Sequence, residues 1–173
     1  QETKAFDRAQ TALAIPLTGS RILLSNIPEG TAEGERIGDQ IHVQSIELNF
    51  QWQVADSTNT VRAVIVKLRD PGTDYLEASE LFAQGTAYAT LSPFNYNNRK
   101  RYNILWDSGP MTLTTQDPQL TRRVNISPKF PVTFQSGSSL IGQNLIYMYL
   151  VSDSAVSTHP VFTGFAQIKY KDG

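Results

Sequence analysis

The sequence predicts an all-β domain made of two packed antiparallel sheets, and three observations support this class. Apolar and polar residues alternate with a period of two along most of the chain. Polar stretches with turn residues separate the alternating segments. Charged residues make up 18% of the chain, below the roughly 25% of average domains, and Ser, Thr, Asn and Gln supply much of the remaining polar surface. With 173 residues and no visible repeat or linker, the chain is long enough for one domain with its own core.

Six segments show the strand pattern most clearly. The expected strands are Ile46–Val54, Val61–Leu68, Tyr102–Trp106, Leu120–Ile126, Asn144–Val151 and Phe162–Tyr170. Shorter strands at Leu13–Ile15 and Ile22–Leu24 bring the total to about eight. Val61–Leu68 is apolar on both parities, which indicates a central strand that is covered on both faces. The aromatic segment Asn144–Val151 is expected to be central as well.

The connections refine this prediction. The apolar parity shifts between Val43 and Ile46, which predicts a bulge or a change of sheet partner. The polar stretch Ala55–Thr60 is expected to be a hairpin loop, and Tyr75–Gln84 has helical spacing, which predicts one short helix inside a long loop. Long, uneven connections favour a single jelly-roll β-sandwich over an immunoglobulin-like one. Immunoglobulin domains are shorter and normally carry a Cys–Trp–Cys core, whereas this chain has no cysteine.

Composition argues against most catalytic chemistry. Without cysteine there is no disulfide, thiolate nucleophile or cysteine metal site. The two histidines, His42 and His159, lie far apart in the sequence and in no motif, so a zinc site is not expected. The segment Gly34–Gly38 lacks the Lys-Ser/Thr ending of a phosphate-binding loop. No apolar run approaches the roughly 20 residues of a membrane span. We therefore expect no enzyme, no cofactor and no membrane partner.

Two kinds of charged cluster remain. Glu29, Glu33, Glu35 and Asp39 crowd one loop; a solvated acidic loop is the favoured interpretation, and structural calcium between subunits is the alternative. The basic clusters are Arg99–Arg101, which follows amide residues and Tyr96, and Arg122-Arg123. Cations beside amides and an aromatic ring suit a nucleic-acid backbone, although such clusters are often only solvated.

Three segments in order resemble one family. They are Gly34–Ile46 (GERIGDQIHVQSI), Val61–Asp70 (VRAVIVKLRD) and Lys100–Asp107 (KRYNILWD). All three are similar to elements of small single-jelly-roll viral capsid proteins. The first resembles the segment that opens the shell strand, and the second resembles a hydrophobic strand ending in Arg/Tyr-Asp. The third resembles a Lys-Arg-aromatic-x-Ile-Leu-x-Asp element. The coat protein of satellite tobacco necrosis virus and the capsid proteins of circular Rep-encoding single-stranded DNA viruses belong to this group. The resemblance covers residues 31–107 clearly and the C-terminal strands by pattern.

The resemblance implies a structural protein of the virion. About sixty copies would form the smallest icosahedral shell (T=1) around a single-stranded DNA or RNA genome. Residues 1–11 would be the stub of an N-terminal arm that faces the genome, with any polybasic stretch upstream, and residues 12–173 would be the shell domain. The candidate nucleic-acid-binding residues are Lys4, Arg8, Arg99, Lys100, Arg101, Arg122 and Arg123.

Subunit contacts are expected in the two longest connections, Ile27–Gln40 and Asp70–Asn98, because long loops in compact domains usually serve a function. The candidate interface residues are Glu33, Glu35, Arg36, Asp39, Asp70, Tyr75 and Phe82. The second hypothesis is a lectin-like carbohydrate-binding jelly roll, in which aromatic rings stack on sugars. Its candidates are Trp52, Trp106, Tyr96 and Tyr102, for which packing in the core or at an interface is the favoured alternative.

Overall fold

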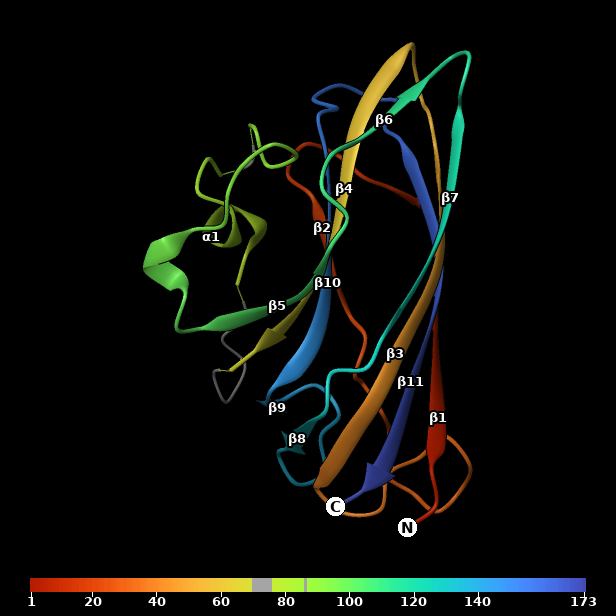
Figure 1. Ribbon diagram of the computed structural model, residues 1–173, viewed down its shortest axis with the longest axis vertical. Coiled ribbons are helices and arrows are strands. Elements are labelled where there is room, and N and C mark those ends of the chain that lie inside the picture. Colours follow the sequence, from red (N-terminus) through yellow and green to blue (C-terminus); the bar gives the residue numbers. More distant parts are fainter. Residues whose placement is uncertain (70–75, 86) are drawn as a thin grey trace.

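The computed structural model describes residues 1–69, 76–85 and 87–173, which form two antiparallel sheets packed face to face (Figure 1). In chain order the elements are β1 (Lys4–Ala14), β2 (Ser20–Leu23), β3 (Gln40–Gln53), β4 (Thr58–Leu68), α1 (Ala78–Leu81), the 3-10 turn η1 (Tyr96–Asn98), β5 (Tyr102–Asp107), β6 (Met111–Thr114), β7 (Gln119–Ile126), β8 (Phe130–Phe134), β9 (Gly142–Gln143), β10 (Leu145–Ser152) and β11 (Val161–Asp172). The six clearest strand predictions are all confirmed, with ends that differ by a few residues.

The strand order identifies the fold as a jelly roll. One sheet runs β1-β11-β3, and β7 and β8 share the far side of β3. The other runs β2-β10-β4, and β5 and β6 share the far side of β4. The chain therefore crosses between the sheets at most of its longer connections, which is the double Greek key of a jelly roll. The predicted fold class is confirmed.

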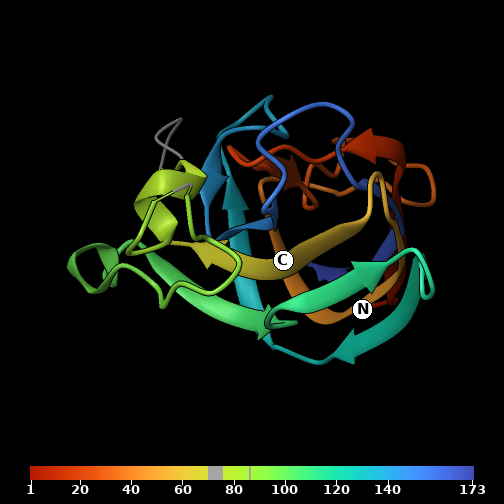
Figure 2. The same cartoon turned by 90° about the horizontal axis from the view of Figure 1, so that it is seen from above.

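The connection after β3 is one of these crossings. We expected Ala55–Thr60 to be a hairpin loop, and this prediction is wrong. β3 and β4 lie in different sheets, which the view from above shows as separate layers, and Thr58–Thr60 already belong to β4 (Figure 2). Alternation shows that each strand buries one face, but it does not distinguish two strands that pair side by side from two that pack face to face.

The parity shift near the start of β3 marks both a bulge and a change of partner, as predicted. Lys169 of β11 pairs with Ser45, but Tyr170 pairs with Val43, so Gln44 is an extra residue. Before the bulge β3 pairs with β8, and after it β3 pairs with β7. One long strand thus serves two neighbours on the same side.

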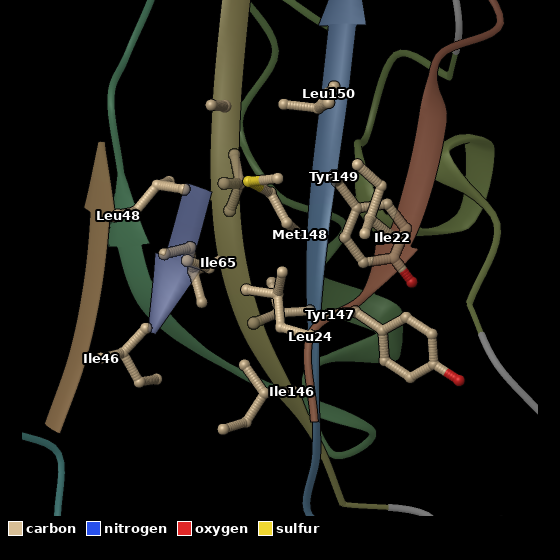
Figure 3. Packing of buried hydrophobic residues seen from close by; sticks show 14 of the residues in the cluster. Ile22, Leu24, Ile46, Leu48, Ile65, Ile146, Tyr147, Met148, Tyr149 and Leu150 are labelled. Carbon is tan, nitrogen blue, oxygen red and sulfur yellow. The ribbon is translucent and has the colours of Figure 1, made fainter. Parts of the chain in front are cut away.

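Buried apolar side chains from both sheets fill the space between them. Ile46 and Leu48 of β3 lie near Ile65 of β4 and Met148 of β10 (Figure 3). All eight residues of β10 are buried, and in β4 every residue from 61 to 66 is buried. Both strands were predicted to be central, and both are. Their outer faces are covered by the connection between β4 and β5.

That connection contains much less helix than expected. The predicted helix Tyr75–Gln84 is reduced to α1, and Tyr75 lies outside the described residues. Phe82 leaves the helix and forms a β-bridge with Phe94, and their rings stack at 5.7 Å. The apolar residues that suggested a helix therefore pack within an irregular loop. Tyr149 of β10 donates a hydrogen bond to the carbonyl of Leu76, which attaches the loop to the sheet, and burial raises the pKa of this phenol.

The first strand is much longer than the expected Leu13–Ile15. β1 begins at Lys4 and pairs with β11, so it crosses the expected division between residues 1–11 and residues 12–173. Its inward positions carry Lys4, Phe6 and Arg8, which lie opposite Tyr170, Ile168 and Ala166. Because two of these inward residues are cations at the edge of the sandwich, the apolar alternation is too weak to be read from the sequence.

Candidate nucleic-acid and subunit interfaces

The basic cluster Arg99–Arg101 lies on a turn at the end of the β4–β5 connection. At the start of η1, the side chain of the preceding Asn95 accepts a hydrogen bond from the backbone N–H of Asn97. The guanidinium of Arg99 lies 3.9 Å from the centre of the Tyr96 ring, which is 70% exposed. Lys100 is exposed, while Arg101 forms an ion pair of 3.3 Å with Glu80 of α1. The cluster therefore presents two cations and an aromatic ring to solvent, and its third cation holds the turn.

The two cations of β1 are engaged inside the molecule. The ammonium of Lys4 lies 2.8 Å from the Asp172 carboxylate and donates to the carbonyl of Glu35. Arg8 reaches across the sandwich and donates to the carbonyl of Leu23 in β2. These contacts join the first strand to the last strand, to the β2–β3 loop and to the opposite sheet. Phosphate would have to compete with them.

Arg122 and Arg123 follow each other on β7, so their side chains point to opposite faces of the sheet. Arg123 lies on the outer face, where its guanidinium is 2.6 Å from the carboxylate of Glu47. Arg122 lies opposite Phe50 and faces the interior edge of the sandwich. The seven predicted nucleic-acid residues thus lie in three places. In both views β1 and the loop before β5 are on opposite sides of the molecule (Figures 1 and 2).

The acidic loop before β3 is organised by an arginine. The side chain of Arg36 is completely buried and lies 3.4 Å from the Asp39 carboxylate and 4.0 Å from that of Glu29. It donates to the carbonyls of Ile27, Gly38 and Ser138, and its guanidinium lies 4.3 Å from the centre of the Phe134 ring. Within residues 1–69, 76–85 and 87–173, no group of three acidic or imidazole side chains could hold a metal ion. The Arg36 guanidinium lies between the carboxylates that would bind calcium in the alternative interpretation.

The predicted interface residues fall into three groups. Glu33 is exposed, and Glu35 and Asp39 are half-buried on the same loop. Arg36 and Phe82 are 0% exposed within the single chain, so their side chains lie beneath the loop surface that a second subunit would meet. Asp70 and Tyr75 lie outside the described residues. We therefore restrict the proposed contact surface to the exposed part of these loops.

Large apolar side chains are exposed at several places on the surface. They are Ile37, Tyr88, Leu91, Tyr96, Leu140, Val156 and Phe165, each at least 53% exposed. The first four lie in the two connections predicted to make subunit contacts, and the last three were not predicted. Ile37 follows the buried Arg36, and Leu140 lies in the loop whose Ser138 binds that arginine, so both belong to one end of the sandwich. Phe165 lies on the outer face of β11, opposite Asn49. The sequence could have indicated this exposure, because Phe165 has the opposite parity to the buried Phe162 and Ala166.

The aromatic candidates of the lectin hypothesis do not form a platform. Trp52 is 0% exposed and packs against Phe162 at 5.1 Å, and Tyr102 is 7% exposed. Tyr96 is covered on one side by the Arg99 guanidinium. Trp106 is half-buried and lies edge-on to Phe50. Packing in the core, the favoured alternative for these residues, therefore holds for Trp52 and Tyr102.

A Ser–His pair occupies the connection between β10 and β11. The hydroxyl of Ser154 lies 2.8 Å from Nδ1 of His159 and within hydrogen-bond distance of the carbonyls of Val156 and Thr158. Among the residues that the structure describes, no carboxylate contacts this imidazole, although a catalytic triad requires such a group to orient the histidine. The pair ties the loop together. His42, the other histidine, is exposed on β3.

Two carboxylates should make the fold sensitive to acid. Burial alone would raise the pKa of Asp107 and of Asp172, but hydrogen bonds and the charges of Arg62 and Lys4 outweigh it and lower both pKa values. A lowered pKa stabilises the fold above the unfolded value of about 3.9, and this stability is lost as the pH falls through the folded pKa. We expect the free energy of unfolding to fall below about pH 4. Urea unfolding from pH 2 to pH 7 would measure this, and Asp172→Asn should flatten the slope in that range.

Comparisons with known proteins give structural neighbours only. No family model and no curated protein sequence matches the chain. The structure of infectious bursal disease virus Gx strain is 11% identical, with 98% of this chain and 33% of that chain covered and a TM-score of 0.41. The Tobacco streak virus coat protein dimer is 12% identical (99% and 86% covered, TM-score 0.39), and Maize Chlorotic Mottle Virus is also 12% identical (100% and 94% covered, TM-score 0.41). The chain spans a third of the first of these proteins and most of the other two. At such identities and TM-scores, function has to be argued from the chain itself.

Proposed function

We propose that this chain is a viral capsid subunit that assembles into a small icosahedral shell around a nucleic-acid genome. The chain would have no catalytic role, and its place would be the virion. Three lines of support come from the chain. The jelly-roll topology is one of the folds of capsid proteins. Three segments resemble capsid proteins in order and spacing. The surface, finally, suits repeated self-association.

The distribution of exposed apolar residues carries the proposal. They lie at three separate places. Ile37 lies in the β2–β3 loop near Leu140 of the β8–β9 loop. Tyr88 and Leu91 lie in the β4–β5 connection, and Phe165 lies on the outer face of β11. A closed shell needs several different contact surfaces on each subunit, because each copy meets neighbours across more than one symmetry axis. A lectin needs one concave site with a few polar groups. Several separate apolar patches therefore favour assembly.

The size of the particles that the purified chain forms tests this proposal directly. We expect the purified chain to sediment as a particle of roughly a megadalton, as a shell of about sixty copies requires. Electron microscopy should show closed spheres. Replacing Tyr88 and Leu91 together by serine should shift the population to small species without unfolding the domain, because both side chains are exposed. A wild-type chain that remains a monomer or dimer at high concentration would contradict the proposal.

The loop cluster gives a test of genome contact. Replacing Arg99, Lys100 and Arg101 together by glutamine should lower the nucleic acid that co-purifies with particles and reduce its salt dependence, because phosphate contacts act by counterion release. The ratio of absorbance at 260 and 280 nm would measure the nucleic-acid content. Arg101→Gln alone is the matched control, since Arg101 pairs with Glu80. Loss of empty shells in the triple variant would instead place the cluster at a subunit contact with acids such as Glu33 or Glu35. Unchanged shells and content would show that it is only solvated.

A further inference from the structure

A groove of about 470 Å³ opens at the edge of the sandwich, between β5 and β6 of one sheet and β7 of the other. Ligand pockets are usually about 300–1,000 Å³, so the groove has room for one small planar group. Trp106, Arg122 and Arg123, which were described above as separate candidates, all line this groove. Its lining combines apolar side chains at the bottom with charged ones at the mouth.

The floor of the groove is an uncovered end of the hydrophobic core. Trp106 pairs with Ile65 and Val124 pairs with Leu48, so both point inward from the two sheets. Phe50, which is 2% exposed, also lines the floor, with its ring centre 5.8 Å from that of Trp106 and its plane inclined at 62° to it. Met111 adds a polarisable side chain. An aromatic and apolar floor of this kind favours a flat, weakly polar group.

The mouth of the groove carries a positive charge that no carboxylate balances within the described part of the chain. Arg122 shares the inward parity of Phe50, and among the described residues its guanidinium donates only to the carbonyl of Thr121, at 3.3 Å. The other charged groups at the mouth are already paired. Arg123 binds Glu47, and Asp107 accepts two hydrogen bonds from Arg62. Charge complementarity therefore calls for a single anionic group beside a flat one.

We propose that this groove binds one nucleotide of a single-stranded nucleic acid, with the base against Trp106 and Met111 and the phosphate at Arg122. A nucleotide joins a flat aromatic group to one negative charge at a short distance, as the lining requires. Recognition would be independent of sequence, because every base has a π-face. The choice of nucleic acid as ligand rests on the proposed function, whereas the groove and its charge do not.

Tryptophan fluorescence gives the test, because the chain has two tryptophans and Trp52 is completely buried. Titration with a short oligothymidylate should quench the emission, and Trp106→Phe should abolish this signal. Arg122→Gln should weaken binding on the order of tenfold, since a hydrogen bond to a charged group is lost. The matched control is Arg21→Gln, which should keep the affinity within about threefold because Arg21 lies on β2, outside the groove. Urea unfolding would show that each variant is folded.

Three outcomes would overturn the inference: no quenching by the oligothymidylate, equal affinity of wild type and Arg122→Gln, or quenching by a long-chain carboxylate such as laurate but not by the oligonucleotide. Sedimentation of the same samples separates this inference from the proposed function. Shells that form normally while the oligonucleotide leaves Trp106 unaffected would refute the groove alone. Specific quenching through Trp106 and Arg122 in a chain that never assembles would support the groove and refute the capsid role.

Discussion

Replacing Arg36 by methionine should destabilise the domain by about 3–5 kcal/mol, because removing one partner from a buried charged network leaves the others unsatisfied. The lost hydrogen bonds connect the β2–β3 loop with Ser138, which lies 102 residues further along the chain. Methionine keeps much of the side-chain length, so the effect reports the lost polar contacts more than a cavity. The free energy of unfolding in urea would measure this loss of stability, with wild type and Arg36→Met compared at the same oligomeric state.

The matched control for this experiment is Arg99→Met. Arg99 is also an arginine beside an aromatic ring and a carbonyl, but it is exposed on the η1 turn. Surface substitutions of this kind usually change stability by less than about 0.5 kcal/mol. Equal effects of the two substitutions would show that the buried network around Arg36 contributes nothing specific. Arg36→Met should also disorder the loop that presents the neighbouring Ile37 to solvent. Assembly should therefore be weaker in this variant.

Replacing Arg62 by methionine should release the β4–β5 connection from the sheet. Its guanidinium donates two hydrogen bonds to the Asp107 carboxylate, at 2.9 and 2.6 Å, and two more to the carbonyls of Ala89 and Ser92, at 3.0 and 2.7 Å. It lies 5.0 Å from the centres of both the Phe82 and the Phe94 rings. We expect a loss of about 3 kcal/mol, because the Arg62 side chain is almost fully buried and its removal leaves the carboxylate and both carbonyls without their donor. Hydrogen exchange should accelerate most in residues 82–94.

A second variant distinguishes the charge of Arg62 from its shape. Arg62→Lys keeps the positive charge but cannot bind both carboxylate oxygens and the two carbonyls at once. We expect an intermediate loss of stability and partial protection of the loop. A uniform change in hydrogen exchange across the domain, with no preference for residues 82–94, would refute the idea that Arg62 anchors this connection.

The local pattern of the sequence determined the six clearest strands and even the irregularity in β3. A period of two is a property of neighbouring residues, so Ile46–Val54 could be read as a strand without knowing its partner. The shift between Val43 and Ile46 could be read in the same way. The predicted short helix is present as α1 but is shorter than Tyr75–Gln84, because spacing alone does not separate a helix from a loop in which Phe82 packs on Phe94.

The tertiary structure alone decided which strands pair and which charged residues are buried. Nothing near Ala55–Thr60 shows that the chain changes sheets there, because the sheet order depends on the pairing of distant strands. Arg36 and Arg62 look like surface residues in the sequence, beside a polar loop and within an apolar strand. Their burial depends on carbonyls and carboxylates that offset the cost of desolvation. Those around Arg62 come from the β4–β5 connection and from β5, and one of those around Arg36 comes from Ser138, so only the fold brings them together. The same reason hid the groove at Trp106, whose walls come from two different sheets.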